Sequence, residues 1–248
     1  MAWKKNKPEH LEKKGDFFYN LVMTNEGIFR YIDHTLLKAV SSWTEIKKLC
    51  DEAILYKTAS VCVPPSYVKP IYEAYREGQK TCKVQICTVI GFPLGYSVKA
   101  AKLLEAEQAL REGASEIDMV INIGDVKNAY FDRVLDEISA IKKTCGEKIL
   151  KVIIETCYLT QEEKIRLCQI ITEAKADYIK TSTGFGTAGA ALADVQLFKQ
   201  HIGNNVKIKA AGGVKTREDL AAFINAGVSR IGTSSAVQLL AGNSTADY

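Results

Sequence analysis

The sequence has few of the residues that build metal centres and disulfide frameworks. Only three histidines occur among 248 residues, and the spacing of His10, His34 and His201 fits no metal site. Seven cysteines are present, an odd number, and no two of them follow a C-x-x-C spacing. In a chain of this length, that usage is typical of reduced, buried thiols. We therefore expect no disulfide framework, no metal and no cofactor.

Long hydrophobic runs are also missing. No window is long enough to span a membrane, and no apolar segment of signal-peptide length follows the first lysines. We expect a cytoplasmic protein without a membrane partner. The net charge of +4 comes partly from a basic N-terminal stretch. We interpret that stretch as a solvated tail and expect no nucleic-acid partner, because no other feature indicates one.

Short apolar runs that predict buried strands recur along the whole chain. They start roughly 23–33 residues apart, which is the length of a βα unit. The eight predicted strands are Tyr31–Leu36, Ala59–Val63, Lys83–Ile90, Glu116–Ile121, Ile149–Glu155, Asp177–Thr181, Val206–Ala210 and Ser229–Gly232.

Amphipathic helical patterns fill the gaps between these runs. Three of them open with a capping-box sequence, at Ser42, Thr160 and Thr216. The predicted helices are Ser41–Leu55, Ser97–Glu112, Asp125–Cys145, Thr160–Lys175 and Thr216–Ala226.

Eight strands that alternate with helices predict an α/β fold, a (β/α)8 TIM barrel in a single domain. A doubly wound open sheet is the alternative, but no glycine-rich dinucleotide motif follows the first strand. We place an N-terminal extension at residues 1–30, the barrel at 31–241 and a C-terminal tail at 242–248. A short helix is expected near Asp16–Met23 within the extension.

Two lysines, Lys180 and Lys209, lie at the ends of predicted strands and are followed by glycine-bearing turns. Lysine is rarely buried, and a buried amine loses its charge readily and becomes a nucleophile. Two such amines facing each other indicate a Schiff-base enzyme. Asp118, in an apolar strand, needs a cationic partner. A structural ion pair with Lys151 is the alternative interpretation of Asp118.

The turns after the last two strands indicate phosphate binding. Gly212 and Gly213 follow the seventh strand, while Gly232, Ser234 and Ser235 follow the eighth. Barrels often bind phosphate at this place through backbone N–H groups. The alternative is that these glycines only form tight turns.

These residues together resemble the deoxyribose-phosphate aldolase family, and the resemblance runs from about Phe29 to the C-terminus. Each matching stretch alone is a weak signal, but their combination in this order is specific. The stretches are Tyr31–Lys38, Val61–Pro64, Gly91–Gly95, Glu116–Asn122, Lys151–Thr156, Tyr178–Phe185 and Lys209–Val214. The resemblance implies a metal-free class I aldolase that interconverts 2-deoxy-D-ribose 5-phosphate with acetaldehyde and D-glyceraldehyde 3-phosphate.

The resemblance also implies roles for residues of this chain. Lys180 corresponds to the Schiff-base lysine, Lys209 to the second lysine and Asp118 to a proton-relay aspartate. The implied phosphate and substrate residues are Gly184, Gly212, Gly213, Gly232, Ser234, Ser235, Cys62 and Thr183. It implies a homodimer or homotetramer, and some members use a C-terminal tyrosine, which here would be Tyr248.

Two other functions stay open from the residues alone. One is another class I phosphosugar lyase, similar to transaldolase, which would often act on ketoses. The other is a non-catalytic phosphosugar-binding barrel, which we would expect to lack Lys180, Lys209 or Asp118. All three residues are present.

Overall fold

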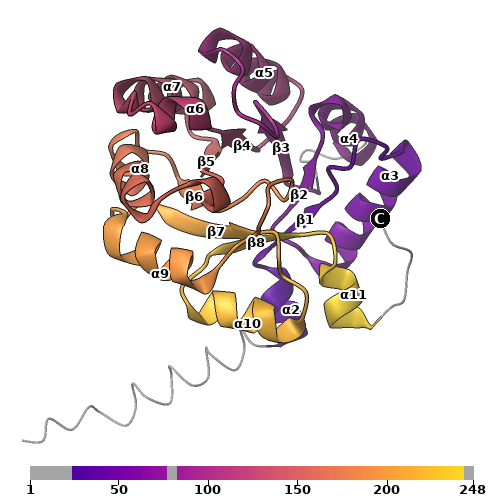
Figure 1. Cartoon of the computed structure of the whole chain (residues 1–248). Helices are drawn as coiled ribbons and strands as arrows, with labels where there is room; N and C mark the ends of the chain where they lie inside the picture. Colours follow the sequence, from indigo (N-terminus) through magenta and orange to yellow (C-terminus); the bar gives the residue numbers. More distant parts are fainter. Residues whose placement is uncertain (1–23, 77–82, 243–248) are drawn as a thin grey trace, which may run out of the picture.

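The computed structural model describes residues 24–76 and 83–242. Eight parallel strands follow one another around a closed barrel, and the last pairs with the first (Figure 1). They are β1 (Ile32–Thr35), β2 (Ser60–Val63), β3 (Ile86–Ile90), β4 (Glu116–Val120), β5 (Ile149–Ile153), β6 (Tyr178–Lys180), β7 (Lys207–Ala211) and β8 (Arg230–Thr233). The predicted (β/α)8 barrel is confirmed, and the open sheet is excluded.

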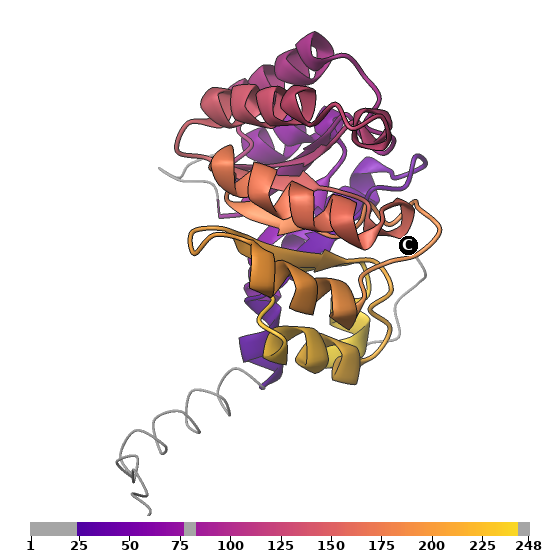
Figure 2. The same cartoon turned by 60° about the vertical axis from the view of Figure 1, so that its left-hand side comes forward.

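Helices surround the barrel and cover the outer faces of its strands (Figures 1 and 2). They are α2 (Asn25–Phe29), α3 (Trp43–Tyr56), α4 (Val68–Arg76), α5 (Lys99–Arg111), α6 (Ile123–Lys127), α7 (Phe131–Cys145), α8 (Gln161–Glu173), α9 (Leu192–His201), α10 (Arg217–Asn225) and α11 (Ala236–Ala241). Two 3-10 helices, η1 (Pro65–Tyr67) and η2 (Thr156–Tyr158), follow β2 and β5.

The three predicted capping boxes begin helices α3, α8 and α10. In each one, the Ser or Thr side chain accepts from a backbone N–H three residues on, and the acidic side chain there accepts from the cap backbone. Because these side chains satisfy amides that have no partner inside the helix, the sequence fixes where each helix starts.

One helix prediction is wrong. The expected helix Asp125–Cys145 is two helices, α6 and α7, because the chain turns at Ala129 with a φ of 57°. The N–H of Tyr130 then donates to the carbonyl of Asp125 at 2.8 Å, and α7 starts in a new direction. Nothing in the amphipathic pattern signals a left-handed residue at an alanine. Helices α4 and α9 were not predicted, and Pro70 in the first turn of α4 obscures its pattern.

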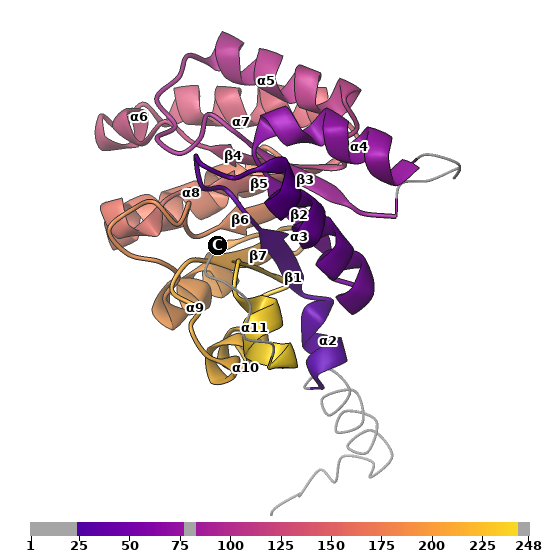
Figure 3. The ribbon, with the colours of Figure 1, turned by 90° about the vertical axis from the view of Figure 1, so that its right-hand side faces the viewer.

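Helix α2 lies inside the segment that we assigned to the N-terminal extension. It packs beside α11, where Asn25 Nδ2 donates to the carbonyl of Leu240 at 2.6 Å (Figure 3). Ile28 and Phe29 of α2 are buried in the hydrophobic core. The helix expected near Asp16–Met23 lies outside the described residues, as does Tyr248.

Hydrophobic side chains fill the layer between strands and helices, whereas charged side chains fill the barrel centre. No helix in residues 24–76 and 83–242 is long and apolar enough to cross a membrane.

Candidate active site

The barrel brings the three predicted catalytic residues together from three strands. Lys180 on β6 and Lys209 on β7 are direct partners in the sheet register. The Nζ atoms of both lysines lie 2.7 Å from the same oxygen, Oδ2 of Asp118 on β4. The two amines therefore cannot be farther apart than the sum of these two distances.

The electrostatics of this group keep Asp118 and Lys209 charged. Burial would raise the pKa of Asp118, but attraction to Lys151, Lys180 and Lys209 holds it well below its ordinary value. Burial would lower the pKa of Lys209, but the carboxylates of Asp118 and Asp33 outweigh it and raise the pKa above its ordinary value. The Oδ2 of Asp33 lies 2.5 Å from Lys209 Nζ.

A second layer of charges lies deeper in the barrel. The Nζ of Lys151 is 2.9 Å from Oδ1 of Asp118, 2.5 Å from Oε2 of Glu116 and 3.5 Å from Oδ2 of Asp33. Arg230 on β8 bridges Asp33 and Glu116, with 2.7 Å between its Nη2 and Glu116 Oε1. Lys151 is thus the structural partner that we considered for Asp118, and it contacts this carboxylate in addition to Lys180 and Lys209.

Sequence reasoning did not assign roles to Asp33, Glu116 or Arg230. The signal for Glu116 was present, because it lies two residues before Asp118 on the same strand and so faces the same side. Arg230 on β8 is the register partner of Lys209 on β7. Its ion pair with Asp33, by contrast, depends on the pairing of β8 with β1 that closes the barrel.

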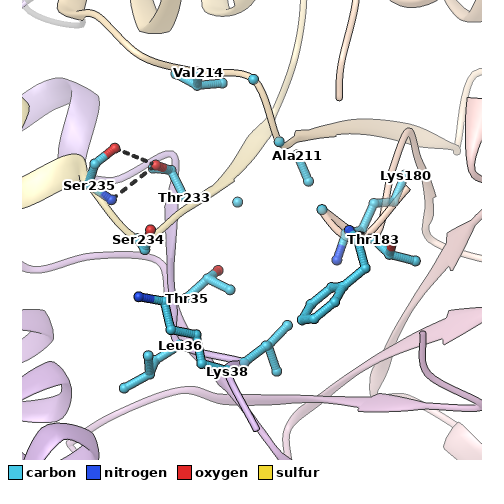
Figure 4. A pocket seen from close by; sticks show the side chains of 16 residues that line it. Thr35, Leu36, Lys38, Lys180, Thr183, Ala211, Val214, Thr233, Ser234 and Ser235 are labelled. Atoms are coloured by element: carbon cyan, nitrogen blue, oxygen red, sulfur yellow. Dashed lines mark hydrogen bonds between the residues drawn. The ribbon is translucent and has the colours of Figure 1, made fainter. Parts of the chain in front are cut away.

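A cavity of about 430 Å³ opens at the carboxyl ends of the strands, above the charged centre (Figure 4). Most of the predicted site residues line it, including Lys180 and both glycine-bearing turns. Its lining residues are Thr35, Leu36, Leu37, Lys38, Lys180, Thr183, Gly184, Phe185, Ala211, Gly212, Gly213, Val214, Gly232, Thr233, Ser234 and Ser235. A volume of this size suits a small sugar phosphate.

The turns around the cavity have distinct roles. Gly212 and Gly213 have φ values of 74° and 75°, which glycine adopts readily and other residues rarely do. Ser235 precedes the short helix α11, and its N–H donates to Thr233 Oγ1 at 3.1 Å. The N–H of Thr183 donates to Glu155 at 3.2 Å, and the Thr183 hydroxyl bonds the same carboxylate. The side chain of Thr183 therefore braces the loop after β6.

Cys62 is not among the residues that line the cavity. It is fully buried on β2, beside its register partner Cys87 and packed under Leu37 and Phe92. A substrate contact of Cys62 stays a prediction.

The thiols and carboxylates of the centre could also act as metal ligands by proximity. Within the described residues, two groups are close enough: Cys62, Cys87 and Asp118, and Asp33, Cys87 and Glu116. The ammonium groups of Lys151 and Lys209 occupy the same space, and their repulsion disfavours a cation there.

The fold and the site define a class of protein. A lysine at the floor of a barrel cavity, next to a second lysine and a shared carboxylate, is the arrangement of a Schiff-base barrel enzyme. Residues 28–245 match the sequence model of the DeoC/LacD family of aldolases, so the chain belongs to this family.

Several proteins that are similar to this chain are named deoxyribose-phosphate aldolase. The deoxyribose-phosphate aldolase of Clostridium botulinum (strain Alaska E43 / Type E3) is 61% identical over 226 residues, covering 91% of this chain and 100% of that protein. The deoxyribose-phosphate aldolase of Clostridioides difficile (strain 630) is 55% identical, covering 89% and 99%. The crystal structure of deoxyribose phosphate aldolase from Aeropyrum pernix is 29% identical, with a TM-score of 0.80 over 91% of this chain and 95% of that one.

Proposed function

We propose that this chain cleaves 2-deoxy-D-ribose 5-phosphate reversibly to acetaldehyde and D-glyceraldehyde 3-phosphate through an imine on Lys180. One observation carries the proposal. Lys180 lines the cavity and also touches Asp118, whereas Lys209 and Lys151 lie behind it in the barrel centre. Lys180 is thus the amine of the charged group that a substrate carbonyl can reach.

The chemistry follows from an amine at this position. Neutral Lys180 attacks C1 of the open-chain aldehyde, and loss of water gives an iminium ion. That cation accepts the electron pair of the C2–C3 bond, while the proton of the C3 hydroxyl passes to a base. Glyceraldehyde 3-phosphate leaves, and the enamine takes a proton at C2. Hydrolysis then releases acetaldehyde and restores Lys180.

Lys209 and Asp118 divide the supporting roles. Lys209 is held charged by two carboxylates, so a fixed positive charge lies next to Lys180. Asp118 accepts hydrogen bonds from both amines. Because its pKa is held low, Asp118 keeps a proton only transiently. Transient protonation is what a relay between Lys180 and the substrate requires.

The glycine-bearing turns form the other end of the proposed substrate site. We assign the 5-phosphate to the loops that contain Gly184, Gly212, Gly213, Gly232, Ser234 and Ser235, where backbone amides can approach its oxygens. The loop braced by Thr183 carries Gly184 at the same wall of the cavity.

Steady-state kinetics on the purified chain test the proposal. We expect release of acetaldehyde and glyceraldehyde 3-phosphate from deoxyribose 5-phosphate, with full activity in EDTA. A preference for ketose phosphates would indicate a transaldolase-like enzyme, and binding without turnover would indicate a non-catalytic barrel. Activity that EDTA removes and Zn²⁺ restores would contradict the metal-free mechanism.

We also propose that the chain is a homodimer or homotetramer. The Aeropyrum pernix relative is described as having a unique tetrameric structure, which supports self-association in this family. Light scattering coupled to gel filtration tests the proposal, and a monomer at micromolar concentration would contradict it.

A further inference from the structure

The cavity has an unusual balance of charge for a site that we assign to a phosphosugar. No aspartate or glutamate is among its lining residues, and its two amines are Lys38 and Lys180. A phosphate monoester carries a charge of about −1.5 to −2 near neutral pH. Burying that charge without a cationic partner is costly. A cationic partner would therefore stabilise the bound phosphate, and among the lining residues only these two amines can supply one.

Lys180 is committed to the opposite end of the cavity. Its Nζ lies 2.7 Å from Asp118, and it forms the proposed imine with C1 of the sugar. One backbone donor of the phosphate loops is already used, because the N–H of Ser235 donates to Thr233 Oγ1 at 3.1 Å. Helix α11 has only six residues, so its dipole adds little positive potential. Among the residues that line the cavity, Lys38 is thus the one formal positive charge at the phosphate end.

Lys38 is placed to supply that charge. It follows β1 in the loop to α3, where Ser41 donates to its carbonyl through Oγ at 2.7 Å and through N–H at 3.1 Å. Figure 4 shows its side chain extending from the β1 side of the cavity, with the amine directed toward Ser234 and away from Lys180. The backbone of Lys38 is therefore held in place, while its long side chain points toward the loop that carries Ser234 (Figure 4).

The ammonium of Lys38 has no competing partner in the described part of the chain. No ion pair there includes Lys38. The charge of Lys38 helps to lower the pKa of Glu45. The Glu45 carboxylate is nevertheless bound in the capping box, 2.6 Å from the Ser42 backbone nitrogen and 2.7 Å from Ser42 Oγ. A phosphate group can therefore bind Lys38 without displacing an existing salt bridge.

We propose that Lys38 is the specificity residue for the 5-phosphate, pairing its ammonium with the phosphate bound at Gly212, Gly213 and Ser234. The proposal rests on the proposed function. Lys38 closes the cavity from the β1 side, opposite the loop after β7, so a phosphorylated sugar is held from two sides. An unphosphorylated sugar gains nothing from this contact, and Lys38 takes no part in the imine chemistry.

Substrate discrimination in Lys38→Gln tests the proposal. A hydrogen bond to a charged group is worth about 10- to 100-fold in affinity. We expect the ratio of kcat/KM for deoxyribose 5-phosphate to that for deoxyribose to fall about 10- to 100-fold, mainly through KM. Lys38→Arg should retain most of the wild-type ratio, since it keeps the charge. Inorganic phosphate should inhibit Lys38→Gln more weakly than the wild type.

Lys215→Gln is the matched control. Lys215 is another exposed lysine close to a phosphate loop, but it does not line the cavity, and its backbone N–H is bound by Asp219 at 2.9 Å. We expect its substrate ratio to equal that of the wild type. An unchanged ratio in Lys38→Gln, or an equal fall in Lys215→Gln, would overturn the proposal.

A failure of the proposed function can be distinguished from a failure of the role of Lys38. If the wild type does not cleave deoxyribose 5-phosphate, the proposed function is wrong. Binding of inorganic phosphate, followed by calorimetry in the wild type and Lys38→Gln, then still reports on Lys38. Equal phosphate affinity of the two proteins would overturn the role of Lys38 whatever the reaction.

Discussion

The barrel centre and the outer helical layer each bury a lysine completely, but they treat its charge in opposite ways. Lys209 in the centre touches two carboxylates, which raise its pKa above the ordinary value despite burial. Lys102 lies in the outer layer, 2.9 Å from Glu137 and 2.8 Å from the Val120 carbonyl. Burial lowers the pKa of Lys102, and attraction to Glu137, Asp125 and Glu105 offsets this only in part.

The number of carboxylates within reach explains the difference. Lys102 directly contacts one carboxylate, whereas Lys209 directly contacts two, and the second contact helps to offset the cost of burial. The barrel centre therefore keeps Lys209 charged beside Lys180, in agreement with the proposed mechanism. The pair of Lys102 and Glu137 has a structural role, because it anchors the end of β4 two residues beyond Asp118.

The largest expected effect follows removal of the shared carboxylate. In Asp118→Asn, we expect turnover to fall 10²- to 10⁴-fold, because the proton relay is lost. The free energy of unfolding should also fall, by up to about 3–5 kcal/mol, since Lys180 loses the carboxylate that it contacts and Lys151 and Lys209 each lose one of theirs. Turnover per folded molecule and melting temperature are measured on the same preparation. Near-normal turnover with a lower melting temperature would mean that Asp118 only fills the barrel.

The second prediction compares Lys209 in the barrel centre with Lys102 in the outer layer. Two unit charges at the separation set by Asp118 interact by about 3 kcal/mol at an effective dielectric constant near 20, or roughly two pH units. In Lys209→Leu, the acidic limb of the kcat/KM profile should move upward by about that amount. Lys102→Leu should leave the limb in place. An unmoved limb in Lys209→Leu would refute the fixed-charge role.

The third prediction concerns the phosphate end of the cavity. Ser234→Asp places an anion against the phosphate, so we expect KM for deoxyribose 5-phosphate to rise at least about 10-fold. Activity on unphosphorylated deoxyribose should fall much less. Equal losses on both substrates would mean that the phosphate lies elsewhere or that the fold is damaged.

The smallest effect is on the pH dependence of stability. The low pKa of Asp118 stabilises the fold above about pH 4, and this contribution is lost as pH falls further. Burial raises the pKa of Glu137, so protonation of Glu137 stabilises the fold as pH falls toward about 4. Below about pH 4, the free energy of unfolding of Asp118→Asn should fall less steeply with decreasing pH than that of the wild type. Above about pH 4, the free energy of unfolding of Glu137→Gln should fall more steeply than that of the wild type. Each slope should differ by up to about 1.4 kcal/mol per pH unit. Denaturant titrations between pH 3 and 7 measure both slopes, and identical slopes in all three proteins would contradict the account.

The sequence predicted what local patterns determine. All eight strands were found because each is a short buried run, and Lys180, Lys209 and Asp118 converge because parallel strands end at one face. Partnerships that depend on closure of the barrel could not be found. Arg230 meets Asp33 and Glu116 only because β8 pairs with β1. Lys102 and Glu137 lie on different helices, and no periodic pattern links them.

Borohydride trapping tests the central claim most directly. The full chain is incubated with acetaldehyde, reduced with borohydride and digested for peptide mass mapping. We expect a single ethyl adduct on Lys180, because the imine forms on the amine that lines the cavity. An adduct confined to Lys209 or Lys151, or no adduct at all, would contradict the assignment of Lys180 as the Schiff-base lysine.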